Sequence, residues 1–163
     1  MVEETGGGFV VNVKDARWYR NAGFGRTCIF EKPGERFEQT GVRLAIIEPG
    51  QPNCLYHREN AQEDFLVLSG ECLLLVNGEE RKLGPWDYFH CPPGVSHVFV
   101  GAGEGPCLIL MVGHRPKEWK VFYPESELAR HHGAEAPEPA EDPKVAYADA
   151  PAWEEADPPP WPI

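Results

Sequence analysis

Residues 64–83, with the sequence DFLVLSGECLLLVNGEERKL, decide the fold of this chain. The runs 66–68 and 73–76 are apolar on both faces, which is typical of strands in the centre of a sheet. Ser69-Gly70 and Asn77-Gly78 flank the second run, and Asn-Gly is the strongest short hairpin signal because both residues tolerate positive φ. The stretch therefore predicts three short strands, at 64–68, 71–76 and 79–83, joined by tight turns.

Short apolar segments continue on both sides of this stretch. They predict further strands at 9–13, 26–30, 42–48, 87–91, 96–100 and 107–112. Short strands about ten residues apart, in a chain with 17 Gly and 17 Pro, indicate an all-β sandwich or barrel. The helical signal is weak, and residues 125–132, between Pro124 and Gly133, predict one short helix.

Length and charge narrow the class of protein. A chain of 163 residues has the size of one ordinary domain. The formal net charge of -11 disfavours a nucleic acid or an anionic membrane as partner, because both attract basic proteins. The longest apolar run, at 107–112, is too short to cross a bilayer. Neither a nucleic acid nor a membrane is therefore expected as a partner.

The five cysteines and the N-terminus indicate the compartment. The cysteines form no Cys-x-x-Cys pair and are odd in number, which argues against a zinc ribbon or a disulfide framework and favours a reducing compartment. The first residues are acidic and then glycine-rich, without the basic and apolar regions of a secretory signal. A cytoplasmic location is the expectation.

Three residues in or beside the predicted strands could carry chemistry: His57, Glu63 and His97. Residues far apart in the sequence can converge on the interior of a closed barrel. Two imidazoles and one carboxylate are the ligand set that holds Fe(II) with open coordination positions, and the same set also suits Zn, Mn or Ni. A substrate, water or dioxygen can bind at such open positions.

These residues also carry a resemblance to a known family. Glu63-x6-Gly70 and Pro92-x-Gly94-x-x-His97 resemble the two signature motifs of the cupin superfamily, and Gly50 lies where the first motif begins. The resemblance implies a small jelly-roll barrel, the double-stranded β-helix, with a metal in its mouth and often a homodimer. We expect a cupin domain at 1–115 with its motif core at 42–112. A Pro- and acid-rich C-terminal extension, 116–163, should be partly extended or disordered.

The first motif departs from the family pattern at the two positions where cupins have histidine. Tyr56 and Arg58 occupy these positions, and His57 falls between them. In a strict register His57 points away from the cavity, so that metal binds weakly or not at all. Alternatively, the chain bulges near His57 and turns it inward.

The second alternative is similar to the pattern of 3-hydroxyanthranilate dioxygenases. These cupins use His-x5-Glu and a distant His after Pro-Pro-Gly, as do His57, Glu63 and His97 here. The arginines that hold the substrate carboxylate in that family correspond to Asn53 and Gly101, so the substrate does not carry over.

Three functions follow as expectations. The first is a metal-dependent enzyme with His57, Glu63 and His97 as ligands, Fe(II) as the favoured ion, and a dioxygenase-type reaction favoured over isomerisation. Arg43 and Arg58 would supply positive charge for an anionic substrate, and Tyr56 could line the pocket. The second is a non-catalytic module that has lost its metal and binds a small molecule through Tyr56 and Arg58. The third is a scaffold without a small-molecule ligand.

Overall fold

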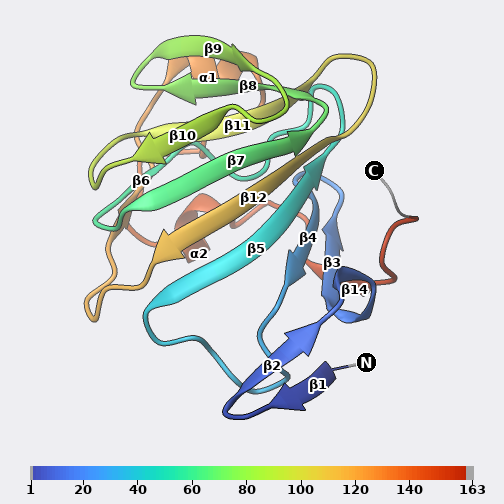
Figure 1. Ribbon diagram of the computed structural model, residues 1–163. Helices are drawn as coiled ribbons and strands as arrows, with labels where there is room; N and C mark the ends of the chain where they lie inside the picture. The colour runs from blue at the N-terminus through green and yellow to red at the C-terminus, as the bar shows by residue number, and fades with distance from the viewer. Residues whose placement is uncertain (1, 161–163) are drawn as a thin grey trace.

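The computed structural model describes residues 2–160, and strands dominate this part of the chain (Figure 1). The strands are β1 (Val2–Thr5), β2 (Gly8–Val11), β3 (Arg17–Asn21), β4 (Gly25–Ile29), β5 (Thr40–Ile47), β6 (Arg58–Glu59), β7 (Glu63–Ser69), β8 (Glu71–Val76), β9 (Glu79–Leu83), β10 (Tyr88–Cys91), β11 (His97–Ala102), β12 (Cys107–His114), β13 (Val121–Phe122) and β14 (Glu154–Ala156). The short helices are the 3-10 turn η1 (Val13–Asp15), α1 (Glu127–His131) and α2 (Pro143–Ala146). No helix among the described residues is long and apolar enough to span a membrane.

The strands form two main antiparallel sheets. The larger sheet has seven strands in the order β10-β7-β12-β5-β4-β3-β14, and the smaller has the order β11-β8-β9. Figure 1 shows β8, β9 and β11 above the long diagonal strands β7, β12 and β5. Side chains of both sheets share one buried cluster, to which Phe65 and Ile109 contribute from the large sheet and Leu74 and Phe99 from the small one. This shared core makes the fold the jelly-roll barrel that the sequence predicts.

The two predicted turns are confirmed, and each has its own physical reason. Asn77 and Gly78 both have positive φ, 46° and 81°, and join β8 to β9 as a two-residue hairpin. Gly70 has a φ of 73° at the point where the chain leaves the large sheet in β7 and enters the small sheet in β8. A side chain at Gly70 would collide with the backbone carbonyl of Pro106, so glycine is required there by close approach as well as by conformation.

The C-terminal segment returns to the barrel. β13 pairs with the short strand β6, and β14 pairs with β3 at the edge of the large sheet. The predicted helix at 125–132 is confirmed as α1, which begins after the N-cap Ser126. Tyr123 and Ala146 pack against Phe24 and Leu55 in a second buried cluster. Met1 and residues 161–163, at the two ends of the predicted domains, lie outside the described residues.

Candidate metal centre

The backbone brings His57 and His97 together inside the barrel. The two residues are antiparallel partners: His97 N–H donates to the carbonyl of His57 at 2.8 Å, and His57 N–H donates to the carbonyl of His97 at 3.2 Å. Directly opposed residues of an antiparallel pair project to the same face. The ring centroids accordingly lie 5.1 Å apart, and the two residues are 8% and 2% exposed.

A bend in the chain before His57 sets this alignment. The chain takes five steps from Pro52 to His57, whereas its partner takes three from Val100 to His97. The two extra residues are accommodated around Leu55. The C-terminal segment holds this bend, because Tyr56 N–H donates to the Ala134 carbonyl at 2.7 Å and Leu55 N–H donates to the Tyr147 hydroxyl at 3.0 Å. The structure thus agrees with the second alternative, in which the chain bulges and His57 faces inward.

The bend leaves Tyr56 and Arg58 on the other side of the chain. Tyr56 is buried against Val98 and Ala129, outside the barrel core. The guanidinium of Arg58 stacks over the ring of Phe122, 4.6 Å from its centroid. The structure therefore does not bring these two predicted substrate-binding residues to the histidine cluster.

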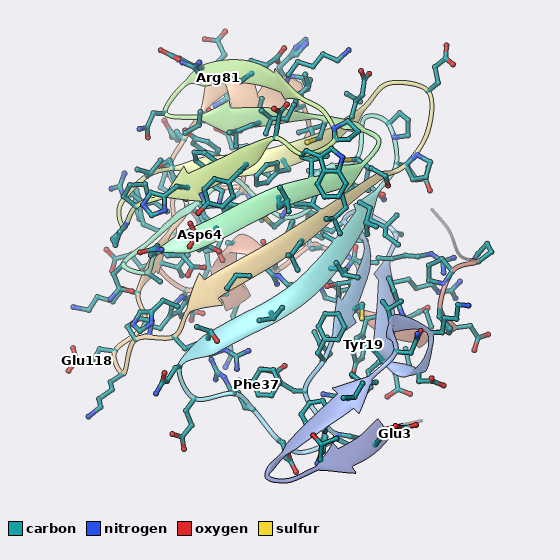
Figure 2. All side chains as sticks on the ribbon, in the orientation of Figure 1. Glu3, Tyr19, Phe37, Asp64, Arg81 and Glu118 are labelled. Carbon is teal, nitrogen blue, oxygen red and sulfur yellow. The ribbon has the colours of Figure 1, made fainter. Side chains whose placement is uncertain are left out.

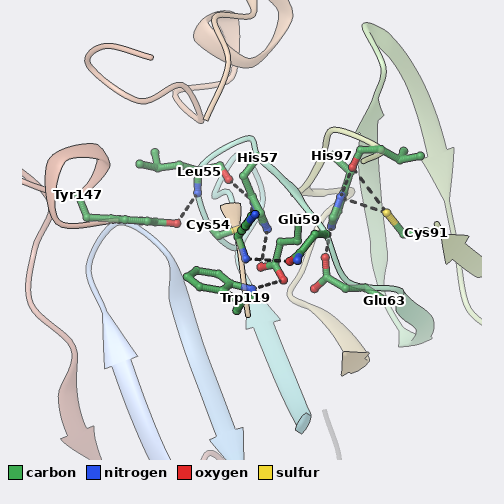
Figure 3. Close-up of polar contacts among 12 residues, drawn as sticks. Cys54, Leu55, His57, Glu59, Glu63, Cys91, His97, Trp119 and Tyr147 are labelled. Carbon is green, nitrogen blue, oxygen red and sulfur yellow. Dashed lines mark hydrogen bonds and ion pairs between the residues drawn. The ribbon is translucent and has the colours of Figure 1, made fainter. Parts of the chain in front are cut away.

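His57, Glu63 and His97 do come together. Each offers one donor atom, and these atoms all lie within 4.8 Å of one another. Glu63, 8% exposed, is the first residue of β7 and shares its inward face with Phe65 and Val67. Its Oε2 lies 3.4 Å from Nε2 of His97 (Figure 3). Convergence of these three residues, as predicted from their spacing, is confirmed.

Backbone carbonyls fix the tautomers of both histidines. Nδ1 of His57 lies 2.8 Å from the carbonyl of Leu55, and Nδ1 of His97 lies 3.2 Å from the carbonyl of Val95. A carbonyl can only accept, so each Nδ1 carries the proton and donates it. In the neutral imidazole this leaves Nε2 with a free lone pair, and Nε2 is the atom of each ring that faces a carboxylate. Metal-ligating histidines are oriented in this way in proteins.

The two imidazoles do not share the same electrostatic environment. Burial alone would lower the pKa of His57, but Cys54, Glu59 and Glu63 together raise it well above the ordinary 6.5. Burial, with the positive charge of His57, lowers the pKa of His97 to about 3. Burial and the nearby charge of Glu59 raise the pKa of Glu63. In the absence of an ion the cluster therefore holds one charged and one neutral imidazole.

Sequence reasoning missed Glu59. Its Oε1 lies 3.4 Å from Nε2 of His57, and its Oε2 accepts a hydrogen bond of 2.7 Å from Nε1 of Trp119 (Figure 3). Burial would raise the pKa of Glu59, but the hydrogen bonds from His57 and Trp119 lower it. The available signal was the spacing of two residues from His57, which places both side chains on one face of a strand once His57 is known to face inward.

A cavity of about 440 Å³ opens beside the cluster. Glu59 and Glu63 line it together with Arg43, Met111 and Trp119. Arg43 belongs to β5, where its side chain alternates with Leu44 and lies at the exposed mouth of the barrel. Of the three predicted substrate-binding residues, Arg43 is thus the one that the structure places next to the candidate metal centre.

His90 lies outside this site. It is half-exposed, and its Nδ1 lies 2.7 Å from Oδ1 of Asp64, which projects from the outer face of the large sheet (Figure 2). The neighbouring Cys91 is buried, with its Sγ 3.3 Å from Nδ1 of His97. This is the alternation expected along a strand.

The donor set fits a divalent ion. Two donors bound about 2.1 Å from one ion lie about 3.0–3.4 Å apart at octahedral or tetrahedral angles, close to the spacing of Glu63 and His97. The two Nε2 atoms are unprotonated when the rings are neutral, and a carboxylate completes the set. His57, Glu63 and His97 are therefore the residues that could hold such an ion.

Comparisons with known proteins agree with the fold. The family model of the cupin domain matches residues 43–113. Among solved structures, a sugar phosphate isomerase of the cupin superfamily from Silicibacter pomeroyi is 25% identical, with 71% of this chain and 69% of that chain covered and a TM-score of 0.56. No match was found among curated proteins.

Two more distant structures share the fold alone. The polyketide cyclase RemF from Streptomyces resistomycificus is 17% identical over 68% of this chain and 82% of that chain, with a TM-score of 0.57. A predicted oxalate decarboxylase from Thermotoga maritima is 19% identical over 66% of this chain and 99% of that chain, with a TM-score of 0.56. Together with the jelly-roll topology, the family model shows that residues 43–113 of the chain form a cupin domain.

Proposed function

We propose that the protein is a metal-dependent enzyme that acts on a small anionic molecule, with the ion held by His57, Glu63 and His97. One observation carries the proposal: the three buried donor atoms lie within 4.8 Å of one another. Both imidazoles are held by their Nδ1–H groups, so that Nε2 is available to a ligand. When both imidazoles are neutral, as ligation through Nε2 requires, the carboxylate of Glu63 leaves the buried cluster negatively charged, and a divalent ion supplies the counter-charge.

The residues of the chain would divide the remaining work. Arg43, at the mouth of the cavity, would bind the anionic group of the substrate and orient it toward the carboxylates. Met111 gives the cavity an apolar wall, which limits access of water. A bound divalent ion would supply a Lewis acid with open coordination positions. Tyr56 and Arg58 have no role at this site in the proposal, because both face the other side of the chain.

The favoured reaction is of the dioxygenase type with Fe(II). Two histidines and one carboxylate leave positions for both a substrate and dioxygen, which is the arrangement used by non-haem Fe(II) oxygenases. An isomerase is the second candidate, supported by the likeness to the Silicibacter pomeroyi protein at 25% identity and a TM-score of 0.56. Non-catalytic binding of a small molecule is the third, and it requires a site without metal.

Metal analysis tests the proposal. The protein, prepared without a His-tag from cells supplied with iron, zinc, manganese and nickel, should contain about one ion per chain. His57→Ala and His97→Ala should each lose most of it, because removal of one ligand from a three-ligand set leaves two. His90→Ala is the matched control, since His90 lies on the outer face, and it should keep the ion. Wild-type protein without metal would favour the non-catalytic module.

The reaction class needs a separate probe that requires no substrate. Nitric oxide binds Fe(II) at positions that dioxygen can reach, and the product has a characteristic electron paramagnetic resonance signal. Protein loaded with Fe(II) should give this signal if substrate and dioxygen positions are open. Loaded protein without the signal would exclude the dioxygenase and leave isomerisation.

A further inference from the structure

We propose that the substrate is a small dianion, whose two negative charges are bound by Arg36 and Arg43. The inference rests on the proposed function, which gives Arg43 an anionic group to bind, and it names the class of substrate. Arg36 belongs to the segment 30–39, which joins β4 to β5. Its side chain lines the same cavity of about 440 Å³ as that of Arg43. A cavity of this volume holds one small molecule, so one molecule can meet both guanidinium groups.

The charges around the cavity leave a surplus of two positive charges. Three carboxylates and three guanidinium groups line it: those of Glu31, Glu59 and Glu63, and those of Arg36, Arg43 and Arg115. His114 also lines the cavity and is counted as neutral. Glu31 and Arg115 neutralise each other, because Oε1 and Nη1 lie 2.5 Å apart. The other two carboxylates balance a divalent ion, which leaves the other two guanidinium groups for the substrate.

The protein itself does not occupy these two guanidinium groups. Among residues 2–160, the side chains of Arg36 and Arg43 take part in no hydrogen bond and no ion pair. Each of the other arginines in this range is engaged by a carboxylate, a backbone carbonyl or an aromatic ring. A guanidinium group binds a carboxylate or a phosphate through two parallel hydrogen bonds. The two arginines without such a partner therefore lie at one cavity, which favours a ligand with two negative charges.

The wall of the barrel directs Arg43 toward the cavity. Arg43 is paired with Met111 across β5 and β12, and Met111 belongs to the buried core of the barrel. Directly opposed residues of an antiparallel pair project to the same face, so Arg43 extends from the inner face of β5. Arg36 has no strand to support it and needs another means of orientation.

Arg115 holds the segment that carries Arg36. Nη1 of Arg115 lies 2.5 Å from Oε1 of Glu31 and donates to the carbonyl of Phe37 at 2.6 Å. Phe37 N–H donates to the same Oε1 at 3.3 Å, and the backbone N–H of Arg115 donates to the carbonyl of Gln39 at 2.8 Å. The chain is thus tied down on both sides of Arg36, which makes Arg115 a positioning residue.

The ion pair of Arg115 and Glu31 lies largely out of solvent. The two side chains are 23% and 7% exposed. Gly41 leaves room for the guanidinium group, because a Cβ at that position would lie 3.0 Å from Nη2 of Arg115. Removal of one partner would leave a buried charge without a counter-charge, which costs far more than the loss of an exposed ion pair. The segment 30–39 is therefore held against the barrel by this pair.

Calorimetric titration of the metal-loaded 163-residue protein tests the inference. Succinate and glutarate carry two charges, and each is compared with its monomethyl ester, which has nearly the same shape and one charge. Glycerol 3-phosphate, compared with its methyl diester, tests for two charges on a single group. We expect at least one dianion to bind about 10–100-fold more tightly than its singly charged ester, because a second charge-assisted contact contributes a factor of this size.

Arg36→Gln should remove this preference and leave the affinity for the singly charged ester unchanged. Arg81→Gln is the matched control, because its side chain is 63% exposed on β9, and it should keep the preference. A wild type without the preference, or an Arg36→Gln variant that keeps it, would overturn the inference while the anion site of the proposed function remains. Wild-type protein that binds none of these anions would refute the anionic substrate of the proposed function, and the inference with it.

The double variant Glu31→Gln/Arg115→Gln tests the positioning role without leaving a lone buried charge. It lacks the guanidinium group that joins Glu31 to Phe37, so the preference for the dianion should fall about 10-fold. The affinity for the singly charged ester should stay unchanged, and circular dichroism should show a folded barrel. A purely structural pair would change both affinities together or neither, and either result would overturn the positioning role of Arg115.

Discussion

Lowering the pH of the metal-free protein from about 6.5 to 5 should destabilise it through His97. The pKa of His97 in the folded protein is about 3, because burial and the charge on His57 disfavour its protonation. In the unfolded chain the imidazole titrates near its ordinary 6.5. The contribution of neutral His97 to the stability of the folded protein is therefore complete above pH 6.5 and is lost as the pH falls toward 3. His57, whose pKa is raised, has the opposite sign: its stabilisation is complete below 6.5 and is lost as the pH rises through its folded pKa.

The contributions of His97 and His57 together give a maximum in the free energy of unfolding near pH 6.5. Below it, the unfolded chain binds one proton more than the folded protein at this pair, which corresponds to about 1.4 kcal/mol per pH unit once His97 is fully protonated in the unfolded chain. Between pH 6.5 and 5 the loss should be about 2 kcal/mol. The raised pKa of Glu63 has the opposite sign: as the pH falls, the folded protein binds a proton at this carboxylate before the unfolded chain does, which offsets part of the loss.

Urea unfolding of chelator-treated protein at several pH values measures this slope. His97→Gln is the control that isolates the buried imidazole, and its free energy of unfolding should vary much less between pH 6.5 and 5. An equal slope in wild type and variant, or a wild type that becomes more stable as the pH falls to 5, would refute the reasoning.

Three further predictions concern the barrel and its assembly. Trp86 has a φ of 73° and its side chain is 74% exposed. Trp86→Gly should therefore raise the free energy of unfolding by about 1 kcal/mol, because glycine relieves the left-handed strain, whereas Trp86→Ala should not. Equal melting temperatures of the two variants would contradict this prediction. Gly70→Ala should lower the free energy of unfolding, measured by chemical denaturation, by more than about 2 kcal/mol, because the new methyl group collides with the Pro106 carbonyl. Gly78→Ala should lower it by only about 1 kcal/mol, because a methyl group there meets nothing within 4 Å. Similar losses in the two variants would show that the close approach at Gly70 is unimportant. The family resemblance predicts a homodimer, and the exposed Tyr88 on the edge strand β10 offers an apolar contact for it. Light scattering should give twice the chain mass of 18.2 kDa, and a mass of 18.2 kDa would exclude the dimer.

The sequence was sufficient for the strands that have strong local signals. Strands predicted at 71–76 and 79–83 match β8 and β9 at both ends, because the Asn77-Gly78 turn fixes their limits. Strand β3 was missed, since RWYRN has an irregular apolar pattern and its pairing is provided by β4 and β14. The strands β6 and β13 contain two residues each, too few for any periodic signal.

At the site, the residue types could be predicted but their directions could not. His57, Glu63 and His97 were found from their spacing and family motif. Whether His57 faced the cavity depended on the bend around Leu55, which is held by Ala134 and Tyr147 from far along the chain. A pairing register of this kind is set by tertiary contacts, and it decides the direction of every neighbouring side chain.

The same register accounts for the residues that were misplaced or missed. Tyr56 and Arg58 point outward because they alternate with His57, and Glu59 points inward for the same reason. As long as the bend is unknown, the sequence is equally compatible with Tyr56 and Arg58 facing the cavity and with His57 and Glu59 facing it.

Anomalous X-ray diffraction at the absorption edges of iron, zinc, manganese and nickel tests the central claim most directly. Crystals of protein prepared with all four metals available should show one peak of anomalous density among Nε2 of His57, Nε2 of His97 and the carboxylate of Glu63. An imidazole of His57 that faces solvent, with no peak between His97 and Glu63, would contradict the proposed metal centre while leaving the cupin barrel intact.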